Sequence, residues 1–255
     1  MQILPLSEIP NEIMTRPRFR LFAGPNGSGK TFFFNHLKSN SIIHTEIYVS
    51  ADKIEADLKR KPVFSFNAYR VKVSDADFKK HILMDGLFEK KINDPSFLQF
   101  LTIKSGVLKI KLAKKEINSY HASFVATYLV KKLLLTGQSF CFETVMSHIS
   151  KVQLLNIAKE AGYKTYLYFV FTDNVELNIA RVNLRMKQGE HGVDASLIKS
   201  RYPRTFRLLS KALAIVEEAF VIDNSYEPEV VFEKYQGKLK IYNSAKPFIK
   251  RYLKK

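Results

Sequence analysis

The stretch AGPNGSGKT at residues 23–31 decides the fold of this chain. It follows the apolar run RFRLFA at residues 18–23, which predicts a strand, and it leads into residues 30–38, which predict a helix. A glycine loop between a strand and a helix is the context in which the pattern G-x-x-x-x-G-K-[ST] binds phosphate groups. The pattern is matched by Gly24, Pro25, Asn26, Gly27, Ser28, Gly29, Lys30 and Thr31.

The residue types of this loop suit the binding of a nucleoside triphosphate. Glycine allows consecutive backbone N–H groups to turn toward a phosphate, where a side chain would obstruct them. The helix that begins at Lys30 adds the positive end of its dipole, and the lysine adds a point charge for the terminal phosphates. The Thr31 hydroxyl is the Mg²⁺ ligand of this motif. The chain is therefore predicted to bind ATP or GTP together with Mg²⁺.

The composition indicates a globular protein of a reducing compartment. The chain has 255 residues, of which 46% are hydrophobic, so it can bury a full core. Its single cysteine excludes a disulfide framework and a four-cysteine zinc site. Pro5, Glu8, Pro10 and Glu12 interrupt the stretch where a signal peptide needs an unbroken apolar run. No uncharged apolar stretch reaches the roughly 18 residues of a membrane span. We therefore expect a cytoplasmic protein without a membrane span.

Short apolar runs alternate with longer helical patterns along the chain. Strands are predicted at residues 42–49, 139–142, 164–171 and 219–222, and helices from near residue 52 and over residues 119–135. This alternation predicts an α/β fold with an open, mainly parallel sheet flanked by helices, of the P-loop kinase type. We expect a single domain over residues 1–255, with an insertion at about residues 61–116 and a basic tail at about residues 238–255.

The rhythm changes within the expected insertion. Residues 63–73 read as extended, and Ser74 with Asp77 marks the start of a helix. Residues 97–103 and 107–112 flank Lys104-Ser105-Gly106, which predicts a hairpin in which Gly106 supplies a positive φ. We expect this segment to lie on the substrate side of the α/β core.

The basic charge is concentrated in two runs. The net charge is 41 − 24 = +17, and residues 104–115 hold five lysines and no acidic residue. Residues 238–255 hold seven basic residues and no acidic one. Either run suits a polyanion such as nucleic acid, or is an ordinary solvated surface. The charge alone does not choose between these interpretations.

Asp52 stands near the carboxyl end of the second predicted strand, where open α/β sheets bind their ligands. A carboxylate there is suited to accept the proton of a hydroxyl that attacks a phosphoryl group. The spacing from Asp52 to Glu55 also resembles a capping box, so Asp52 is equally well explained as a helix cap.

Glu143 and Thr144 end the strand FCF at residues 140–142. An acid in this place is a candidate to ligate Mg²⁺ through water or to hold an acceptor hydroxyl, and the alternative is an ordinary strand-end carboxylate. Cys141 lies inside the apolar strand and is interpreted as a core residue.

Arg181 and Arg185 are four residues apart on a predicted helix, so they project from one face of it. The helix leads into a glycine loop at residues 188–192 that includes His191. Two guanidiniums beside such a loop suit a closing lid that neutralises the transferred phosphoryl group, although a solvated helix face explains them as well. Arg201, Arg204 and Arg207 follow on a predicted pair of helices and are further candidates.

Taken together, these segments resemble the zeta toxin family of P-loop kinases. The resemblance rests on AGPNGSGKT at residues 23–31, SAD at 50–52 and GQSFCFETVMS at 137–147. It continues with AGYKTYLYFVF at 161–171, ARVNLRMKQGEHGVDASLIKSRY at 180–202 and DNS at 223–225. It spans roughly residues 18–225, and the order and spacing of the segments make it more specific than the phosphate loop alone.

The resemblance implies that ATP or GTP phosphorylates a hydroxyl of a small molecule. In toxin members of the family the acceptor is the sugar of UDP-N-acetylglucosamine, and a small antitoxin protein blocks the nucleotide site. By motif position, Asp52 matches the catalytic aspartate, while Arg181 and Arg185 match the arginine-bearing helix. Glu143 and Thr144, and His191 in the lid, match the acceptor side.

The chain departs from the family pattern at several positions. Ser50 replaces an asparagine before the Ala-Asp pair, Glu190 stands in the glycine loop, and Asp194 replaces a common proline. Residues 61–116 have no counterpart in the family pattern, and acceptor specificity is expected to reside there.

Three hypotheses of function remain from the sequence. The first is a small-molecule kinase in which Lys30 and Thr31 hold the nucleotide and Asp52 activates the acceptor. The second is a kinase for the 5′-hydroxyl of a polynucleotide, motivated by the charge. The third is a nucleotide-gated protein-binding module that hydrolyses ATP slowly.

Overall fold

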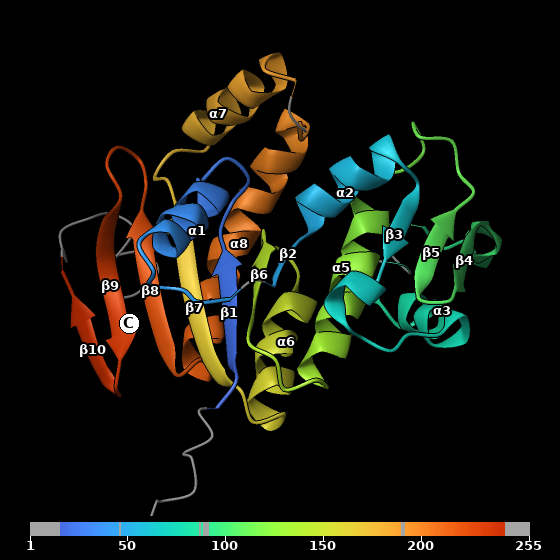
Figure 1. The fold of residues 1–255 in the computed structure, drawn as a ribbon. Helices are drawn as coiled ribbons and strands as arrows, with labels where there is room; N and C mark the ends of the chain where they lie inside the picture. The colour runs from blue at the N-terminus through green and yellow to red at the C-terminus, as the bar shows by residue number, and fades with distance from the viewer. Residues whose placement is uncertain (1–15, 46, 87, 89–91, 190–191, 243–255) are drawn as a thin grey trace, which may run out of the picture.

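The central sheet places the phosphate loop between two parallel neighbours (Figure 1). The structure is a computed structural model that describes residues 16–45, 47–86, 88, 92–189 and 192–242. Seven strands form the sheet in the order β10-β9-β8-β7-β1-β6-β2, and the five from β8 to β2 are parallel. In chain order they are β1 (Arg18–Ala23), β2 (Tyr48–Ser50), β6 (Phe140–Thr144), β7 (Lys164–Phe171), β8 (Glu218–Asp223), β9 (Glu229–Tyr235) and β10 (Lys238–Ile241).

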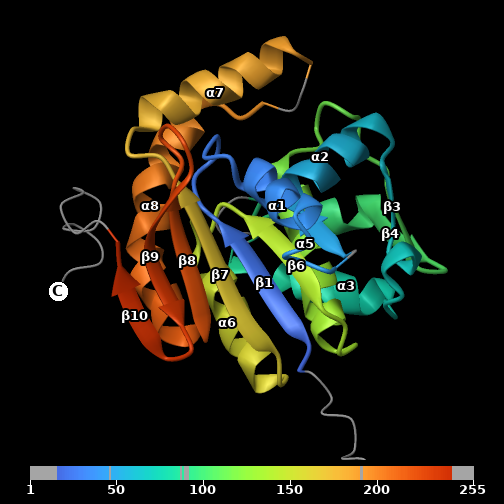
Figure 2. The same ribbon diagram turned by 60° about the vertical axis from the view of Figure 1, so that its left-hand side comes forward.

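Helices cover both faces of this sheet, as parallel strands require (Figures 1 and 2). Alternate side chains of β1 point to opposite faces. Phe19 and Leu21 join the larger core with the helices α5 (Ser119–Leu134), α6 (Ile149–Glu160) and α8 (Ala195–Ile215). Phe22 joins the smaller core under α1 (Lys30–Ser39), where its ring meets Phe34 edge-on at 5.4 Å. The expected α/β fold with an open, mainly parallel sheet is confirmed.

A second, three-stranded sheet lies beside α5. It is antiparallel, in the order β3-β5-β4, with β3 (Val63–Ser65), β4 (Leu101–Lys104) and β5 (Val107–Ile110). The predicted hairpin is present, and its turn residues Ser105 and Gly106 have φ of 52° and 74°. The predicted helix also forms, as α3 (Asp75–Leu83), with the Ser74 hydroxyl accepting a hydrogen bond from the Asp77 amide.

Several predicted boundaries are wrong, for identifiable reasons. The strand expected at residues 42–49 is limited to Tyr48–Ser50, because the Thr45 hydroxyl bonds to the Ser139 carbonyl where a strand amide would pair. Residues 95–100 form the 3₁₀ helix η3 (Pro95–Phe100), capped by Asp94 and begun by Pro95. The helix pair expected after the glycine loop is the single helix α8, which contains Pro203.

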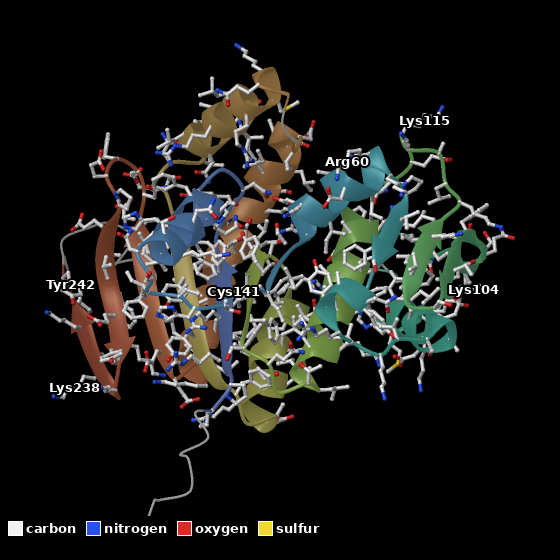
Figure 3. The ribbon with its side chains drawn as sticks, viewed as in Figure 1. Arg60, Lys104, Lys115, Cys141, Lys238 and Tyr242 are labelled. Atoms are coloured by element: carbon white, nitrogen blue, oxygen red, sulfur yellow. The ribbon has the colours of Figure 1, made fainter. Side chains whose placement is uncertain are left out.

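The two strands β9 and β10 add an antiparallel edge that the sequence reading missed. Residues 238–241 of the expected basic tail form the edge strand, and residues 243–255 lie outside the described residues. Figure 3 shows Lys104 and Lys115 at one side of the molecule and Lys238 at the opposite side. The two basic runs therefore do not join into one surface in the part of the chain that the structure describes.

Candidate active site

The phosphate loop has no space for side chains at two of its glycines. Gly24 has φ of 145°, and a Cβ there would lie 1.9 Å from the Val170 carbonyl oxygen. Gly27 has φ of 76°, and its Cβ would lie 2.4 Å from the carbonyl oxygen of Asn178 in α7 (Val175–Lys187). The side-chain amide of Asn224 donates to the Ser28 carbonyl at 2.8 Å. Strand β7, helix α7 and the turn after β8 thus fix the shape of the loop.

The Lys30 ammonium is buried inside this loop. It donates hydrogen bonds to the carbonyl oxygens of Gly24 and Pro25, at 3.0 Å and 2.8 Å. Burial lowers its pKa, and the negative charges of Glu143 and Asp52 oppose that shift. The positive charge of Arg185 lowers it further, which places the Arg185 guanidinium within electrostatic range of the loop. The ammonium therefore faces both acids that the sequence analysis proposed.

Glu143 lies at the end of β6, beside the first turn of α1. Its Oε2 accepts a hydrogen bond from the Thr31 hydroxyl at 2.8 Å and another from the Tyr48 hydroxyl. Burial raises the pKa of Tyr48, and the nearby negative charge of Glu143 raises it further. Thr31 and Glu143 thus bring two oxygen donors together next to the phosphate loop.

The Thr31–Glu143 pair suits one particular kind of cation site. Mg²⁺ takes one or two protein oxygens and completes its shell with phosphate oxygens and water. Among the described residues, no group of three or more His, Cys, Asp or Glu side chains forms a cage for a metal. The oxygen donors present fit Mg²⁺ held jointly with a nucleotide.

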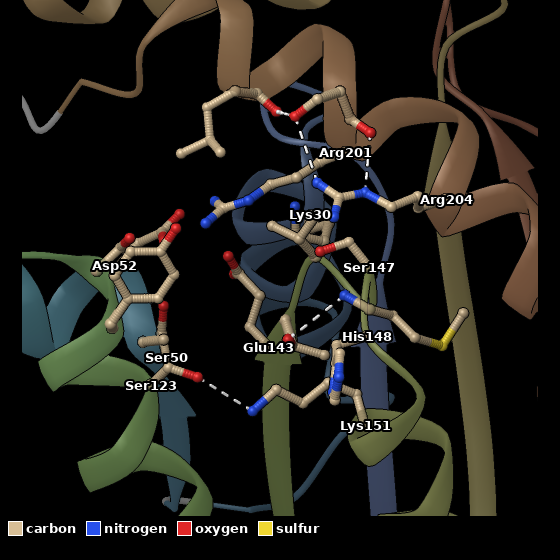
Figure 4. A pocket seen from close by; sticks show the side chains of 18 residues that line it. Lys30, Ser50, Asp52, Ser123, Glu143, Ser147, His148, Lys151, Arg201 and Arg204 are labelled. Carbon is tan, nitrogen blue, oxygen red and sulfur yellow. Dashed lines mark hydrogen bonds between the residues drawn. The ribbon is translucent and has the colours of Figure 1, made fainter. Parts of the chain in front are cut away.

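Asp52 stands in the first turn of α2 (Ala51–Arg60) and is half-buried. The residue that caps this helix is Ser50, whose hydroxyl accepts from the Lys53 amide at 3.5 Å. The interpretation of Asp52 as the cap is therefore wrong. Asp52 lines a pocket instead, across from Lys30 and Glu143 (Figure 4).

This pocket opens at the carboxyl ends of β1, β2 and β6, where open α/β sheets bind ligands. Arg201 and Arg204 enter it from α8. The Thr205 hydroxyl of the same helix donates to the Val145 carbonyl at 3.1 Å, which ties α8 to the loop after β6. Thr144 lines the pocket as expected from the sequence.

Several lining residues were missed by the sequence reading. They come from the amino ends of α5 and α6 and from the loop before α6, and they are Ser119, Tyr120, Ser123, Met146, Ser147, His148 and Lys151. The usable signal is their position directly after a strand end or at a helix start. In total, the charged residues lining the pocket are four cations and two anions: Lys30, Lys151, Arg201 and Arg204 against Asp52 and Glu143.

Arg181 and Arg185 lie on one side of α7, and neither lines the pocket. The Arg181 guanidinium donates to the carbonyl oxygens of Asn224 and Ser225, at 2.8 Å and 3.3 Å, and so holds the turn that contacts Ser28. The Nε of Arg185 is buried without a hydrogen-bond partner among the described residues. His191 lies outside the described residues.

No helix in the described ranges combines the length and apolar character that crossing a membrane requires. The expectation of a chain without a helical membrane span is consistent with this finding.

Comparison with known proteins identifies one family. The family model described as Zeta toxin matches residues 112–246, more than half of the chain. The matched range includes Glu143, Arg181 and Arg185, whereas the phosphate loop and Asp52 precede it. An uncharacterized protein of Haemophilus influenzae is 35% identical over 63 residues, which cover 25% of this chain and 45% of that protein.

Two solved structures share the fold. The crystal structure of AvrRxo1-ORF1:-ORF2 with ATP aligns with a TM-score of 0.57 at 13% sequence identity, and the match covers 90% of this chain and 61% of that chain. The native AvrRxo1-ORF1:-ORF2 complex aligns with a TM-score of 0.55 at 14% identity, and covers 90% and 62% of the two chains. This chain therefore spans less than two thirds of each of these relatives.

Proposed function

Because the chain belongs to the zeta toxin family, we propose that it is an ATP-dependent P-loop kinase that phosphorylates a hydroxyl of a small-molecule acceptor. The observation that carries this proposal is the convergence of Lys30, Asp52 and Glu143 on one pocket at the carboxyl ends of the parallel strands. A phosphate-binding lysine and a carboxylate across from it are the two groups that transfer to an alcohol needs. ATP in a solved structure of similar fold supports ATP as the donor, with GTP as the alternative.

The metal would be held by the Thr31 hydroxyl and the Glu143 carboxylate. When bound, Mg²⁺ neutralises charge on the β- and γ-phosphates. Before it binds, Glu143 holds the Thr31 hydroxyl in place, and Tyr48 holds Glu143. The protein therefore supplies a preorganised pair of oxygen ligands.

The transfer step follows from the remaining residues. Asp52 accepts the proton of the acceptor hydroxyl, whose oxygen forms a bond to the γ-phosphorus. The bond between that phosphorus and the β,γ-bridging oxygen breaks, and ADP leaves with the electron pair. Lys30 binds the oxygens of the transferred group, which is why its position inside the loop matters.

Arginines complete the charge balance of the step. Arg201 and Arg204 line the pocket, and Arg185 has an unpartnered Nε near the loop. We assign these three to the oxygens of the transferring phosphoryl group. Arg181 acts through the turn at Asn224 as a positioning residue, and its direct role in a lid stays a prediction.

The family resemblance makes a UDP-amino sugar the first acceptor to test and an antitoxin the first protein partner to seek. The two-chain complex of similar fold supports a protein partner. A polynucleotide acceptor has less support, because the two described basic runs lie on opposite sides of the molecule.

The test is to incubate the protein with γ-labelled ATP, Mg²⁺ and a panel of nucleotide sugars, sugars and oligonucleotides. The proposal expects label on a small molecule. Label on oligonucleotides favours the polynucleotide kinase, with salt-dependent binding as its second sign. ATP binding without transfer to any acceptor contradicts the kinase proposal and favours the nucleotide-gated module.

A further inference from the structure

Lys151 is a buried lysine that the proposed phosphoryl transfer does not use. It stands in the first turn of α6, only 6% of its surface is exposed, and it lines the candidate pocket. Its ammonium donates hydrogen bonds to the hydroxyls of Ser123, at 3.2 Å, and Thr127. Figure 4 shows it directed toward Ser123 at the end of the pocket away from Arg201 and Arg204.

The surroundings of this ammonium do not balance its charge. Among the described residues, no carboxylate lies within ion-pair distance of it, and its hydrogen-bond partners are neutral hydroxyls. Burial lowers the pKa of Lys151 to about 8, and only the more distant charge of Asp85 opposes the shift. Most buried lysines are paired with an acid, because an uncompensated charge is costly to bury.

The position in the helix adds to the imbalance. The amino end of a helix is positively charged, so a cation there is unfavourable and an anion is favourable. Helix α6 is capped by His148, which also lines the pocket. Two positive sources, the ammonium and the helix end, therefore meet at one end of a pocket.

Other lysines with acidic side chains nearby show the usual arrangement. Lys59 pairs with the buried Glu55 at 2.7 Å, and Lys164 pairs with the buried Glu218 at 2.5 Å. Lys30 has carbonyl partners instead, and it belongs to the loop proposed to bind phosphate. Lys151 resembles Lys30 in this respect: a buried ammonium, neutral partners and a helix amino end.

We propose that Lys151 and the amino end of α6 form an anion subsite for the acceptor, so that the acceptor is a hydroxyl compound carrying a phosphate or carboxylate group. This inference rests on the proposed kinase function. The Arg201 end of the pocket serves the nucleotide, and the Lys151 end holds the acceptor by its charge with its hydroxyl toward Asp52. Lys151 is thus a specificity-determining residue, and neutral alcohols are poor acceptors.

The first experiment measures anion binding. The protein is saturated with Mg²⁺ and a non-hydrolysable ATP analogue, and is titrated by calorimetry with inorganic phosphate and, separately, with acetate. The two arms distinguish a phosphate subsite from a carboxylate subsite. Lys151→Met is expected to weaken binding of the preferred anion by about tenfold or more. Lys159→Met, an exposed lysine on the same helix, is expected to leave it unchanged.

A second measurement uses the unaltered protein, so it does not depend on folding of a variant. Acetylation of Lys151 by acetic anhydride is followed by mass spectrometry with and without the preferred anion, with Lys159 as the internal reference. Slower acetylation of Lys151 alone is expected. Equal anion affinity of Lys151→Met and the wild type, or no binding of either anion to the nucleotide-loaded wild type, overturns the inference.

The two proposals fail in different ways. If the protein does not bind the ATP analogue, or labels no acceptor, the kinase proposal fails whatever Lys151 does. If label transfer occurs but is equal for N-acetylglucosamine and its 1-phosphate, and is unaffected by Lys151→Met, only the acceptor subsite is wrong.

Discussion

The substitution Gly27→Ala tests whether the phosphate loop is shaped by its contact with α7. Gly27 has φ of 76°, a left-handed conformation that costs an alanine about 1–2 kcal/mol. The added Cβ would also lie 2.4 Å from the Asn178 carbonyl oxygen. That oxygen belongs to a helix interior and cannot move freely, so forcing the contact apart costs about a further 1–3 kcal/mol. The expected loss of stability is roughly 3 kcal/mol.

The matched control is Gly162→Ala. Gly162 has φ of 82°, and a Cβ there meets nothing within 4 Å, so only the conformational cost of about 1–2 kcal/mol applies. A domain of this size loses about 2–4 °C in Tm for each kcal/mol. We expect Tm to fall by roughly 10 °C for Gly27→Ala and by roughly 4 °C for Gly162→Ala. The difference between the variants isolates the contact with Asn178.

The assay pairs thermal unfolding with calorimetric titration of ATP and Mg²⁺. Gly27→Ala is expected to lower ATP affinity by about tenfold or more, equal to about 1.4 kcal/mol, because the loop must move away from α7. Gly162→Ala should bind ATP as the wild type does. If Gly27→Ala is no less stable than Gly162→Ala and binds ATP normally, the described packing of the loop is wrong.

Three further predictions concern the site and the core. Glu143→Gln keeps an acceptor for Thr31 but removes the charge, so Mg²⁺ affinity in the presence of ATP should fall by about tenfold or more; Tyr48→Phe, which keeps the carboxylate, should retain Mg²⁺ binding in the same titration. Arg181→Met leaves two carbonyl groups without their donor, so urea unfolding should show a loss of about 1–3 kcal/mol, whereas a purely catalytic arginine would lower turnover without affecting stability. Burial, aided by the charge of Lys131, lowers the pKa of His81 from 6.5 to about 4. The unfolded chain then binds a proton that the folded chain does not, so stability should fall by roughly 2 kcal/mol from pH 7 to pH 5, and urea unfolding of His81→Gln should show this dependence removed.

The elements around the phosphate loop were predictable because their signals are local. A strand of alternating core residues, a glycine loop and a helix start are contiguous in residues 18–39, and tertiary context changes none of them. Asp52 and Glu143 were found for a related reason, since each ends a strand of a parallel sheet. Strands β9 and β10 were missed because β10 is exposed along its whole length and lacks the alternation of a half-buried strand.

The rest of the pocket depends on contacts between distant segments. Arg201 and Lys151 come from helices 50 residues apart in sequence, and nothing in their local patterns says that both line one pocket. Arg181 shows the opposite case. Its spacing from Arg185 suggested a lid, but its nearest acceptors are the carbonyls of the turn at Asn224, which no helical periodicity can reveal.

Label transfer from γ-labelled ATP by the wild type and by Asp52→Asn, measured beside their ATP affinities, tests the central claim most directly. The asparagine keeps the size of the side chain and cannot take up the acceptor proton. We predict ATP affinity within about twofold of the wild type, and transfer to the acceptor slower by about 10²–10⁴-fold. Transfer at the wild-type rate by a folded Asp52→Asn protein would contradict the assignment of this pocket as a site where a carboxylate activates an alcohol for phosphorylation.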